Sequence, residues 1–171
     1  MSDKLQEFYI NVIEKKYIVK YRQISAFDSW VESIEKLDVS NTECDYVPSL
    51  PNLKSLTAKN CNIRSLPQLP NVQEINIPYN ELVELYFYPM CKHLYADHNN
   101  LTLVFPGNYL TIDLSYNNLE TLPLFPKALS VKCTHNNIKE FYGGENLQYL
   151  YIRNNPIKNL RYVKTPIFCD L

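Results

Sequence analysis

A repeat of about 19 residues is the feature that most constrains this chain. Segments with the same pattern begin at seven points: Ile34, Leu53, Val72, Cys91, Tyr109, Ala128 and Leu147. Successive starts differ by 19 residues, except for one step of 18 residues between Cys91 and Tyr109. Self-similarity at a period of about 20 residues is typical of a solenoid, in which each repeat packs on its neighbours. We number the positions of each repeat from its first residue.

Four positions of the repeat are apolar almost throughout. Position 4 holds Leu37, Leu56, Ile75, Leu94, Ile112, Val131 and Leu150, and position 6 holds Val39, Ala58, Ile77, Ala96, Leu114, Cys133 and Ile152. A spacing of two residues places both positions on one face of a β-strand. Positions 11 and 14 are also apolar and are expected to bring the chain back over the same core. Positions 3, 5 and 7 are then expected to face outward.

Position 9 carries an asparagine in the last five repeats. These residues are Asn80, Asn99, Asn117, Asn136 and Asn155, whereas the first two repeats have Thr42 and Cys61. Position 9 follows the predicted strand, where backbone N–H and C=O groups leave the sheet and would cost about 1–3 kcal/mol each if buried unpaired. A side-chain amide offers both a donor and an acceptor. The sequence therefore predicts a structural ladder of asparagine amides that pairs these backbone groups.

Prolines recur in the second half of the repeat. Position 15 holds Pro48, Pro67 and Pro123, and position 18 holds Pro51, Pro70, Pro89 and Pro126. A repeat of this length leaves too few residues for a regular helix after the strand and the turn, and proline would break one. The return arm is therefore predicted to be extended or polyproline-like, with 3₁₀ turns.

The pattern L-x-x-L-x-L-x-x-N-x-L, complete in "YLTIDLSYNNLETL" with Tyr109 at its first position, resembles the leucine-rich repeat family. The short period and the linkers "SLPQLPNV" and "TLPLFPKA" are most similar to the repeats of bacterial effector proteins and some large-virus proteins. The resemblance implies an α/β-type leucine-rich repeat solenoid that is mostly β and has little helix. It also implies a curved parallel β-sheet that binds proteins on its concave face.

The two ends of the chain depart from the repeat. Residues 1–33 are expected to form an N-terminal capping segment, with a short amphipathic helix at "LQEFYINVIEKK" and a strand at "YIVKYRQISAF". Residues 34–164 are expected to form the seven repeats, and residues 165–171 a truncated repeat that adds an edge strand. Atypical terminal units are common in solenoids because the exposed ends of the core must be covered.

Charge and hydropathy limit where the protein acts. The formal net charge is −1 and no predicted strand face is strongly basic, so nucleic acid is not expected as a partner. The start MSDKLQEFYI lacks the regions of a signal peptide, and no apolar run is long enough to span a bilayer. The 5 cysteines follow no disulfide spacing, which indicates a reducing compartment. We therefore expect a cytoplasmic monomer, in the host cytoplasm for an effector, with no membrane contact.

Candidate catalytic and metal-binding residues form no constellation in the sequence. The cysteines fall at different core positions, so we interpret them as buried structural thiols: Cys44, Cys61, Cys91, Cys133 and Cys169. The three histidines face outward and are spaced too widely to share a metal ion: His93, His98 and His135. Asp97 and Asp113 approach the separation of a glycosidase pair, which leaves a small hydrolase as one alternative, although an open face excludes no water. No cofactor, metal ion or enzymatic activity is predicted.

The outward positions carry the residues that we expect to bind a partner. Aromatic and charged side chains gather there toward the C-terminal half: His93, Tyr95, Asp113, Lys132, Tyr149, Tyr151 and Arg153. Tyrosine and arginine often anchor protein interfaces, but tyrosine is also frequent in this chain and suits strands. The sequence thus predicts a non-enzymatic module that binds a partner protein on its concave face, as an adaptor or as a viral or pathogen effector. The alternative is a regulatory or targeting subunit of an enzyme such as a protein phosphatase.

Overall fold

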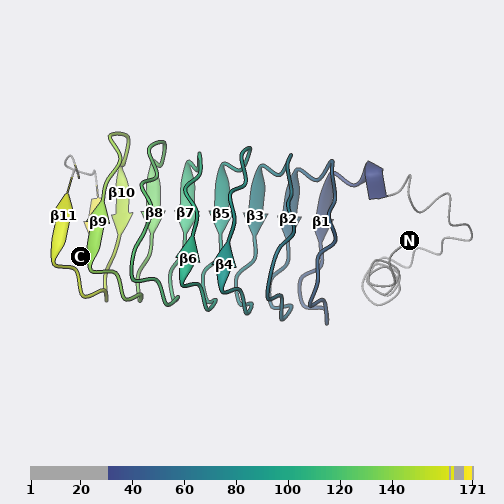
Figure 1. Cartoon of the computed structure of the whole chain (residues 1–171), viewed down its shortest axis with the longest axis horizontal. Helices are drawn as coiled ribbons and strands as arrows, with labels where there is room; N and C mark the ends of the chain where they lie inside the picture. Colours follow the sequence, from purple (N-terminus) through teal and green to yellow (C-terminus); the bar gives the residue numbers. More distant parts are fainter. Residues whose placement is uncertain (1–30, 162, 164–167, 171) are drawn as a thin grey trace, which may run out of the picture.

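The computed structural model describes residues 31–161, 163 and 168–170. Successive repeats stack along one axis, and their strands form one parallel sheet along the solenoid (Figure 1). In order across this main sheet, the strands are β1 (Lys36–Asp38), β2 (Ser55–Thr57), β3 (Glu74–Asn76), β5 (His93–Tyr95), β7 (Thr111–Asp113), β8 (Ser130–Lys132), β10 (Tyr149–Tyr151) and β12 (Phe168–Asp170). The described residues contain one helical segment, residues 31–33. The predicted parallel β-solenoid with little helix is confirmed.

The predicted terminal units lie at the two ends of the chain. The helix and the strand that we predicted before residue 31 lie outside the described residues, so the capping segment stays a prediction. At the other end, β12 pairs with β10 and extends the main sheet. Within the described residues, no helix has the length and apolar character that crossing a membrane requires.

The register between strands aligns equal positions of successive repeats. Leu37 at position 4 pairs with Leu56, and the same correspondence continues along the sheet. Position 4 is buried in each main-sheet strand from β1 to β10, while positions 3 and 5 beside it are exposed or half-buried. The prediction that position 7 faces outward is wrong for Pro78 and Ser115, which are buried where the chain leaves the strand.

One continuous apolar core runs through the stacked repeats. Its central side chains at position 4 are fully shielded from solvent: Leu56, Ile75, Leu94, Ile112 and Leu150. Burying such a side chain stabilises the fold by about 1.5–3 kcal/mol relative to leaving it exposed. In the seventh repeat, however, Ile157 is half-buried and Leu160 is exposed. Leu160 thus departs from its predicted core position, because its return arm is the last one in the described part of the chain.

The return arms on the opposite side of the core are extended, and some of them pair. Two pairs of short parallel strands form there: β4 (Glu84–Leu85) with β6 (Leu103–Val104), and β9 (Glu140–Tyr142) with β11 (Asn159–Arg161). In the first pair, the backbone N–H of Phe105 at position 15 donates to the carbonyl of Leu85 at 3.0 Å. Proline cannot donate this bond. The three described arms with proline at position 15 contain no strand.

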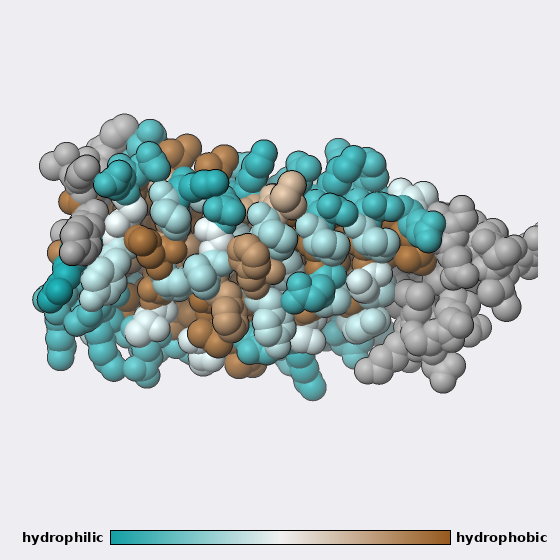
Figure 2. All heavy atoms as spheres, turned by 45° about the horizontal axis from the view of Figure 1, so that its top comes forward, coloured by the Kyte–Doolittle hydropathy of each residue, from teal (hydrophilic) through white to brown (hydrophobic). Residues whose placement is uncertain are grey.

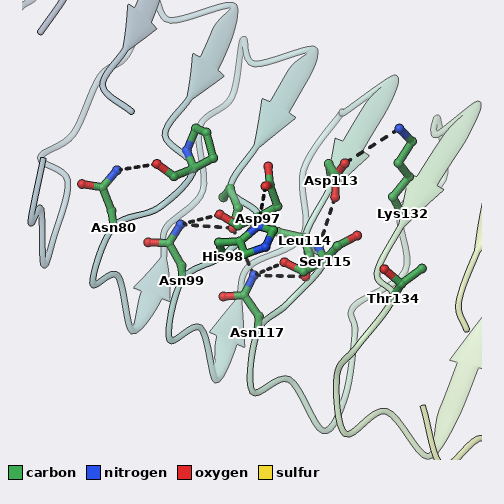
Figure 3. A network of polar contacts seen from close by, with 12 residues as sticks. Asn80, Asp97, His98, Asn99, Asp113, Leu114, Ser115, Asn117, Lys132 and Thr134 are labelled. Carbon is green, nitrogen blue, oxygen red and sulfur yellow. Dashed lines mark hydrogen bonds and ion pairs between the residues drawn. The ribbon is translucent and has the colours of Figure 1, made fainter. Parts of the chain in front are cut away.

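The side chain of Asn117 shows how position 9 holds the turn after each strand (Figure 3). Its Nδ2 donates to the carbonyl oxygens of Ala96 at 3.0 Å, Leu114 at 3.0 Å and Ser115 at 3.2 Å. Its Oδ1 accepts the backbone N–H of Leu101 at 2.9 Å. Ala96 and Leu101 belong to the preceding repeat, so one buried amide both closes its own turn and ties two repeats together.

The same hydrogen bonds recur along the solenoid with changes at its N-terminal end. Equivalent bonds, to the carbonyls two, three and 22 residues earlier, are made by Asn80, Asn99, Asn136 and Asn155. In the second repeat, the Sγ of Cys61 donates to Val39 at 3.0 Å and to Lys59 at 3.3 Å. In the first, the Oγ1 of Thr42 donates to Val39 at 2.6 Å. These two side chains therefore make some of the hydrogen bonds to backbone carbonyls that asparagine makes in the other repeats.

The repeat that is one residue short is accommodated by a glycine and a tyrosine. Position 17 holds a large, buried apolar or aromatic side chain in four repeats: Leu50, Leu69, Tyr88 and Phe125. The short repeat has Gly107 there, and a Cβ on it would lie 2.3 Å from Cε2 of Tyr109. The ring of Tyr109 is fully buried and packs edge-on against Phe125, with centroids 5.8 Å apart. Tyr109 thus fills the space of the missing side chain.

We expect Asn117→Ala to lower the free energy of unfolding by about 1–3 kcal/mol, because it leaves buried backbone groups of two repeats unpaired. Asn118→Ala is the matched control, since Asn118 is the exposed neighbour and its loss should cost less than about 0.5 kcal/mol. Urea unfolding of both variants measures the difference. Equal midpoints would contradict the structural role of the amide.

Gly107→Ala should lower the free energy of unfolding by about 1–3 kcal/mol, because the new methyl group overlaps the buried ring of Tyr109. In a Tyr109→Leu background the ring is absent, and the same change should become neutral or stabilising, since alanine restricts the unfolded chain. A double-mutant cycle of unfolding free energies measures this coupling. Strictly additive effects would show that the two residues do not compete for one space.

Candidate protein-binding site

The parallel register brings four of the predicted binding residues into one row. At position 5, Tyr95 pairs with Asp113 across β5 and β7. Lys132 on β8 pairs with Asp113 on one side and with Tyr151 of β10 on the other. Because neighbouring strands lie about 4.8 Å apart, Tyr95 and Tyr151 are separated by about 14 Å. The row lies on the outer face of the main sheet, which is the face that we predicted to be concave.

The other three predicted residues flank this row. At position 3, His93 lies on β5 and Tyr149 on β10, with two small polar residues in register between them. Arg153 follows β10 and is exposed, as are Tyr149 and Lys132. The other four side chains are half-buried. We call all seven residues the outer sheet patch: His93, Tyr95, Asp113, Lys132, Tyr149, Tyr151 and Arg153.

Lys132 contacts two of its neighbours within the outer sheet patch. Its Nζ lies 3.9 Å from Oδ2 of Asp113, a contact drawn in Figure 3, and 5.4 Å from the centroid of the Tyr151 ring. Both interactions are weak at an exposed side chain, because water screens the charges. They orient the lysine over the row and leave its ammonium group accessible to a partner.

Asp113 sits where its negative charge is disfavoured. Burial raises the pKa of the Asp113 carboxyl, hydrogen bonds from Ser115 oppose this effect, and the charge of Asp97 raises the pKa further. The backbone N–H of Ser115 donates to Oδ1 of Asp113 at 3.1 Å. Asp97 also contacts His98, whose Nδ1 lies 2.8 Å from Oδ2 of Asp97. A cation on a partner would therefore stabilise the ionised form of Asp113.

A stack of aromatic rings borders the outer sheet patch, and sequence analysis did not identify it as a unit. Rings at position 8 of successive repeats stack with centroids 4.2 to 4.3 Å apart: Tyr79, His98, Tyr116 and His135. At one end, Nζ of Lys59 lies 5.3 Å from the centroid of Tyr79. At the other end, Nδ2 of Asn154 lies 2.7 Å from Nε2 of His135. The signal in the sequence was the aromatic run down position 8 of the middle repeats.

Position 8 has a left-handed backbone in all seven repeats. The angle φ lies between 54° and 58° at Asn41, Asn60, Tyr79, His98, Tyr116, His135 and Asn154. Asparagine tolerates this region, whereas a bulky side chain such as tyrosine is uncommon there. Tyr79 and Tyr116 nevertheless remain 47% and 45% exposed. Ring stacking therefore offsets part of the backbone cost at these positions.

A second group of exposed apolar side chains lies on the return arms, where sequence analysis predicted extended chain alone. Position 15 is aromatic rather than proline at Tyr86, Phe105 and Tyr142. These residues and three exposed neighbours form what we call the return-arm patch: Tyr86, Phe87, Leu103, Phe105, Leu124 and Tyr142. The signal in the sequence was the interruption of the proline pattern at position 15. On the face shown in Figure 2, hydrophobic side chains form separate groups within a mainly hydrophilic surface.

The described cysteines are buried and free: Cys44, Cys61, Cys91 and Cys133. Burial raises the pKa of the Cys44 and Cys91 thiols to about 12, and it also raises the pKa of Cys133. Within the described residues, no group of three or more His, Cys, Asp and Glu side chains is placed to hold a metal ion. The side chain of Cys169 lies outside the described residues.

Asp97 and Asp113, the pair considered for a hydrolase, lie on the open face of the main sheet. Cavities of about 500 Å³ and 370 Å³ lie elsewhere, the first beside Leu124 and Tyr142 and the second beside Ile157. Hydrolysis of a glycoside by a carboxylate pair needs a site that holds the sugar and excludes water. The open sheet face is suited to binding a broad surface instead.

The described thiols should react slowly with a thiol-reactive dye in the native protein, because the thiolate is the reactive form. At a pKa of about 12 instead of 9.0, Cys44 and Cys91 hold roughly a thousand times less thiolate. All thiols should react quickly in denaturant, and Cys169 on the edge strand β12 is expected to react first in the native state. Rapid labelling of native Cys133, located by mass spectrometry, would place position 6 outside the core.

Solved structures that resemble this solenoid include two proteins of bacterial pathogens. A Shigella effector leucine-rich repeat domain matches with a TM-score of 0.70 and 21% sequence identity, over 92% of this chain and 77% of that chain. YopM from Yersinia enterocolitica matches with a TM-score of 0.55 and 16% identity over 94% of this chain, which spans 53% of the YopM chain. No family model and no curated protein matches the sequence. The shared architecture shows that this chain folds as a leucine-rich repeat solenoid.

Proposed function

We propose that this protein is a non-enzymatic interaction module that binds a partner protein through the outer sheet patch. The observation that carries the proposal is the continuous row formed by Tyr95, Asp113, Lys132 and Tyr151 on four neighbouring strands. Tyrosine and arginine are enriched at the centres of protein interfaces, where they supply most of the binding energy. The patch combines three tyrosines with an arginine and a lysine.

The main sheet holds these side chains on a rigid backbone. Tyr149 and Tyr151 stand on β10, which is paired on both sides with β8 and β12. A tyrosine ring has few rotatable bonds, so fixing it on binding costs little entropy. The row spans about 14 Å, which fits within the roughly 800 Å² that each partner buries in a standard interface. Arg153 adds a fork of N–H donors at the end of the row.

The fold comparison supports an effector or adaptor role as part of this proposal. The Shigella structure with the same fold is a domain of an effector. In this proposal the chain acts as a monomer in the cytoplasm, or in the host cytoplasm if it is an effector, and binds a partner protein there. The free, buried thiols fit a reducing compartment. We assign residues 34–164 to the seven repeats, residues 1–33 to an N-terminal cap and residues 165–171 to a truncated repeat.

Tyr151→Ala should weaken partner binding by about 2 kcal/mol, or roughly 30-fold, because tyrosine rings at protein interfaces often supply a large share of the binding energy. The fold should survive, since the side chain lies outside the core. Proteins captured from a lysate by the wild type and by the Tyr149→Ala/Tyr151→Ala variant are compared by quantitative mass spectrometry. Affinity for the captured partner is then measured directly. Thr57→Ala is the matched control, because Thr57 occupies position 5 of the second repeat, on β2; this change should leave capture unchanged.

Capture that survives the double tyrosine change would contradict the proposed site. Loss of capture on changing Gln68 or Lys127 in the return arms would move the site to the opposite side of the solenoid. An enzyme that is recovered with the wild type and is lost with the double variant would identify the module as the targeting subunit of that enzyme. That outcome keeps the outer sheet patch and selects the alternative function.

A further inference from the structure

We propose a second interaction surface: the return-arm patch binds an amphipathic α-helix of a partner protein, with an apolar stripe flanked by lysine or arginine. The patch lies on the return arms, and the core separates it from the outer sheet patch. The proposal is therefore independent of the function assigned to the main sheet.

Repeats with an exposed aromatic residue at position 15 can be compared with repeats that have proline there. Position 15 is proline in the first, second and fifth repeats and is aromatic in the third, fourth and sixth, at Tyr86, Phe105 and Tyr142. These three residues are 37% to 39% exposed. The proline repeats form the same main-sheet strands and contribute to the same core, so neither of these features requires the rings. Exposed apolar groups that folding does not require indicate a binding surface.

The return-arm patch has at least one exposed member in each repeat from the third to the sixth. The rings of Tyr86 and Phe105 stack at an interplanar angle of 24°. Leu103 is also exposed and belongs to β6, which pairs with β4; Phe105 and Tyr86 follow these two strands directly. At the far end, Leu124 and Tyr142 line the cavity of about 500 Å³, whose lining also includes Gly143 and Gly144. A depression beside exposed aromatic rings suits an anchoring side chain of a partner.

The spacing of the patch fits a helix better than a strand. Equal positions in adjacent repeats lie about 4.8 Å apart, and the ring centroids of Tyr86 and Phe105 are 6.0 Å apart. Side chains on one face of a helix recur at about 5–6 Å, whereas those on one face of a strand recur at about 6.6 Å or more. The third and sixth repeats are thus about 14 Å apart, and a helix of about ten residues, at 1.5 Å per residue, has this length. A helix along the solenoid axis thus places about one side chain on each repeat.

Carboxylates stand next to the rings of the return-arm patch. Glu84 precedes Tyr86 by two residues and accepts a hydrogen bond from its hydroxyl. Glu140 and Tyr142 repeat this arrangement, with the hydroxyl donating to Oε2 at 3.0 Å. The hydrogen bond from Tyr142 lowers the pKa of Glu140, with a further bond from Asn159, so this carboxylate is ionised at neutral pH. Each end of the aromatic row therefore carries a negative charge.

The overall charge of these arms favours a basic partner. Residues 83–90, 102–108, 120–127 and 139–146 together contain four glutamates and two lysines, a formal charge of −2. One of the lysines, Lys139, is paired with Glu120 at 2.9 Å. Complementary charge speeds association and selects the orientation of a partner. Lysine or arginine on both sides of the apolar stripe of a helix would face Glu84, Glu140 and Glu145.

The test uses a labelled peptide of leucine and lysine, about 18 residues long so that it forms a stable helix, with leucines at i, i+3, i+4 and i+7. Fluorescence anisotropy with the full chain should show saturable binding that weakens at high salt. The variant Phe105→Ser/Leu124→Ser should weaken it by about tenfold or more. Serine keeps the backbone N–H that Phe105 donates to Leu85, and urea unfolding checks that the variant folds. Tyr149→Ala/Tyr151→Ala is the matched control and should bind the peptide as the wild type does.

Several results would overturn this proposal while leaving the function of the main sheet open to its own test. These are the absence of saturable binding, equal binding of a peptide with glutamate in place of lysine, and unchanged binding by the Phe105→Ser/Leu124→Ser variant. Loss of peptide binding in the double tyrosine variant would place the peptide on the outer sheet patch instead. Sedimentation that shows self-association, abolished by Phe105→Ser/Leu124→Ser, would assign the return-arm patch to a second copy of this chain.

Discussion

The amide of the asparagine at position 9 is the interaction on which the solenoid depends. At the end of each strand the chain turns inward, and the backbone groups that leave the sheet would stay unpaired in a dry core. In Asn117, Nδ2 donates hydrogen bonds to three carbonyls and Oδ1 accepts one from a backbone N–H, so one side chain pairs backbone groups of two repeats. Because a repeat contacts mainly its neighbours, stability is added one junction at a time. The amide ladder supplies polar bonds at each junction, next to the apolar core.

The same turn determines what the solenoid presents to its surroundings. Its left-handed residue at position 8 directs a side chain to the edge of the outer face in every repeat. In the middle repeats these side chains are rings, and they stack between Lys59 and Asn154 beside the outer sheet patch. Strained backbone of this kind persists where the surrounding structure holds it in place. The amide at position 9, one residue later, provides that support.

The length of the repeat shapes the opposite side. After the strand and the turn, too few residues remain for a helix, so the return arm stays extended and its outward side chains are uncovered. Where position 15 is proline, the arm presents a small surface and forms no strand within the described repeats. Where it is aromatic, as at Phe105, the backbone N–H is available for pairing and the ring is exposed. The choice between proline and an aromatic residue at position 15 thus bears on both the backbone pairing and the exposed surface of an arm.

The period, the strand positions and most of the core followed from the sequence alone, because each position is sampled seven times and its physical role is averaged over the repeats. Where a role depends on neighbours, this reasoning was wrong: Leu160 is exposed at the end of the core, and Ser115 is buried at a turn. Only the tertiary structure decided which side chains of different repeats touch. Lys132 meets Asp113 and Tyr151, and four rings form one stack, because the register joins residues about 19 apart that no local pattern relates.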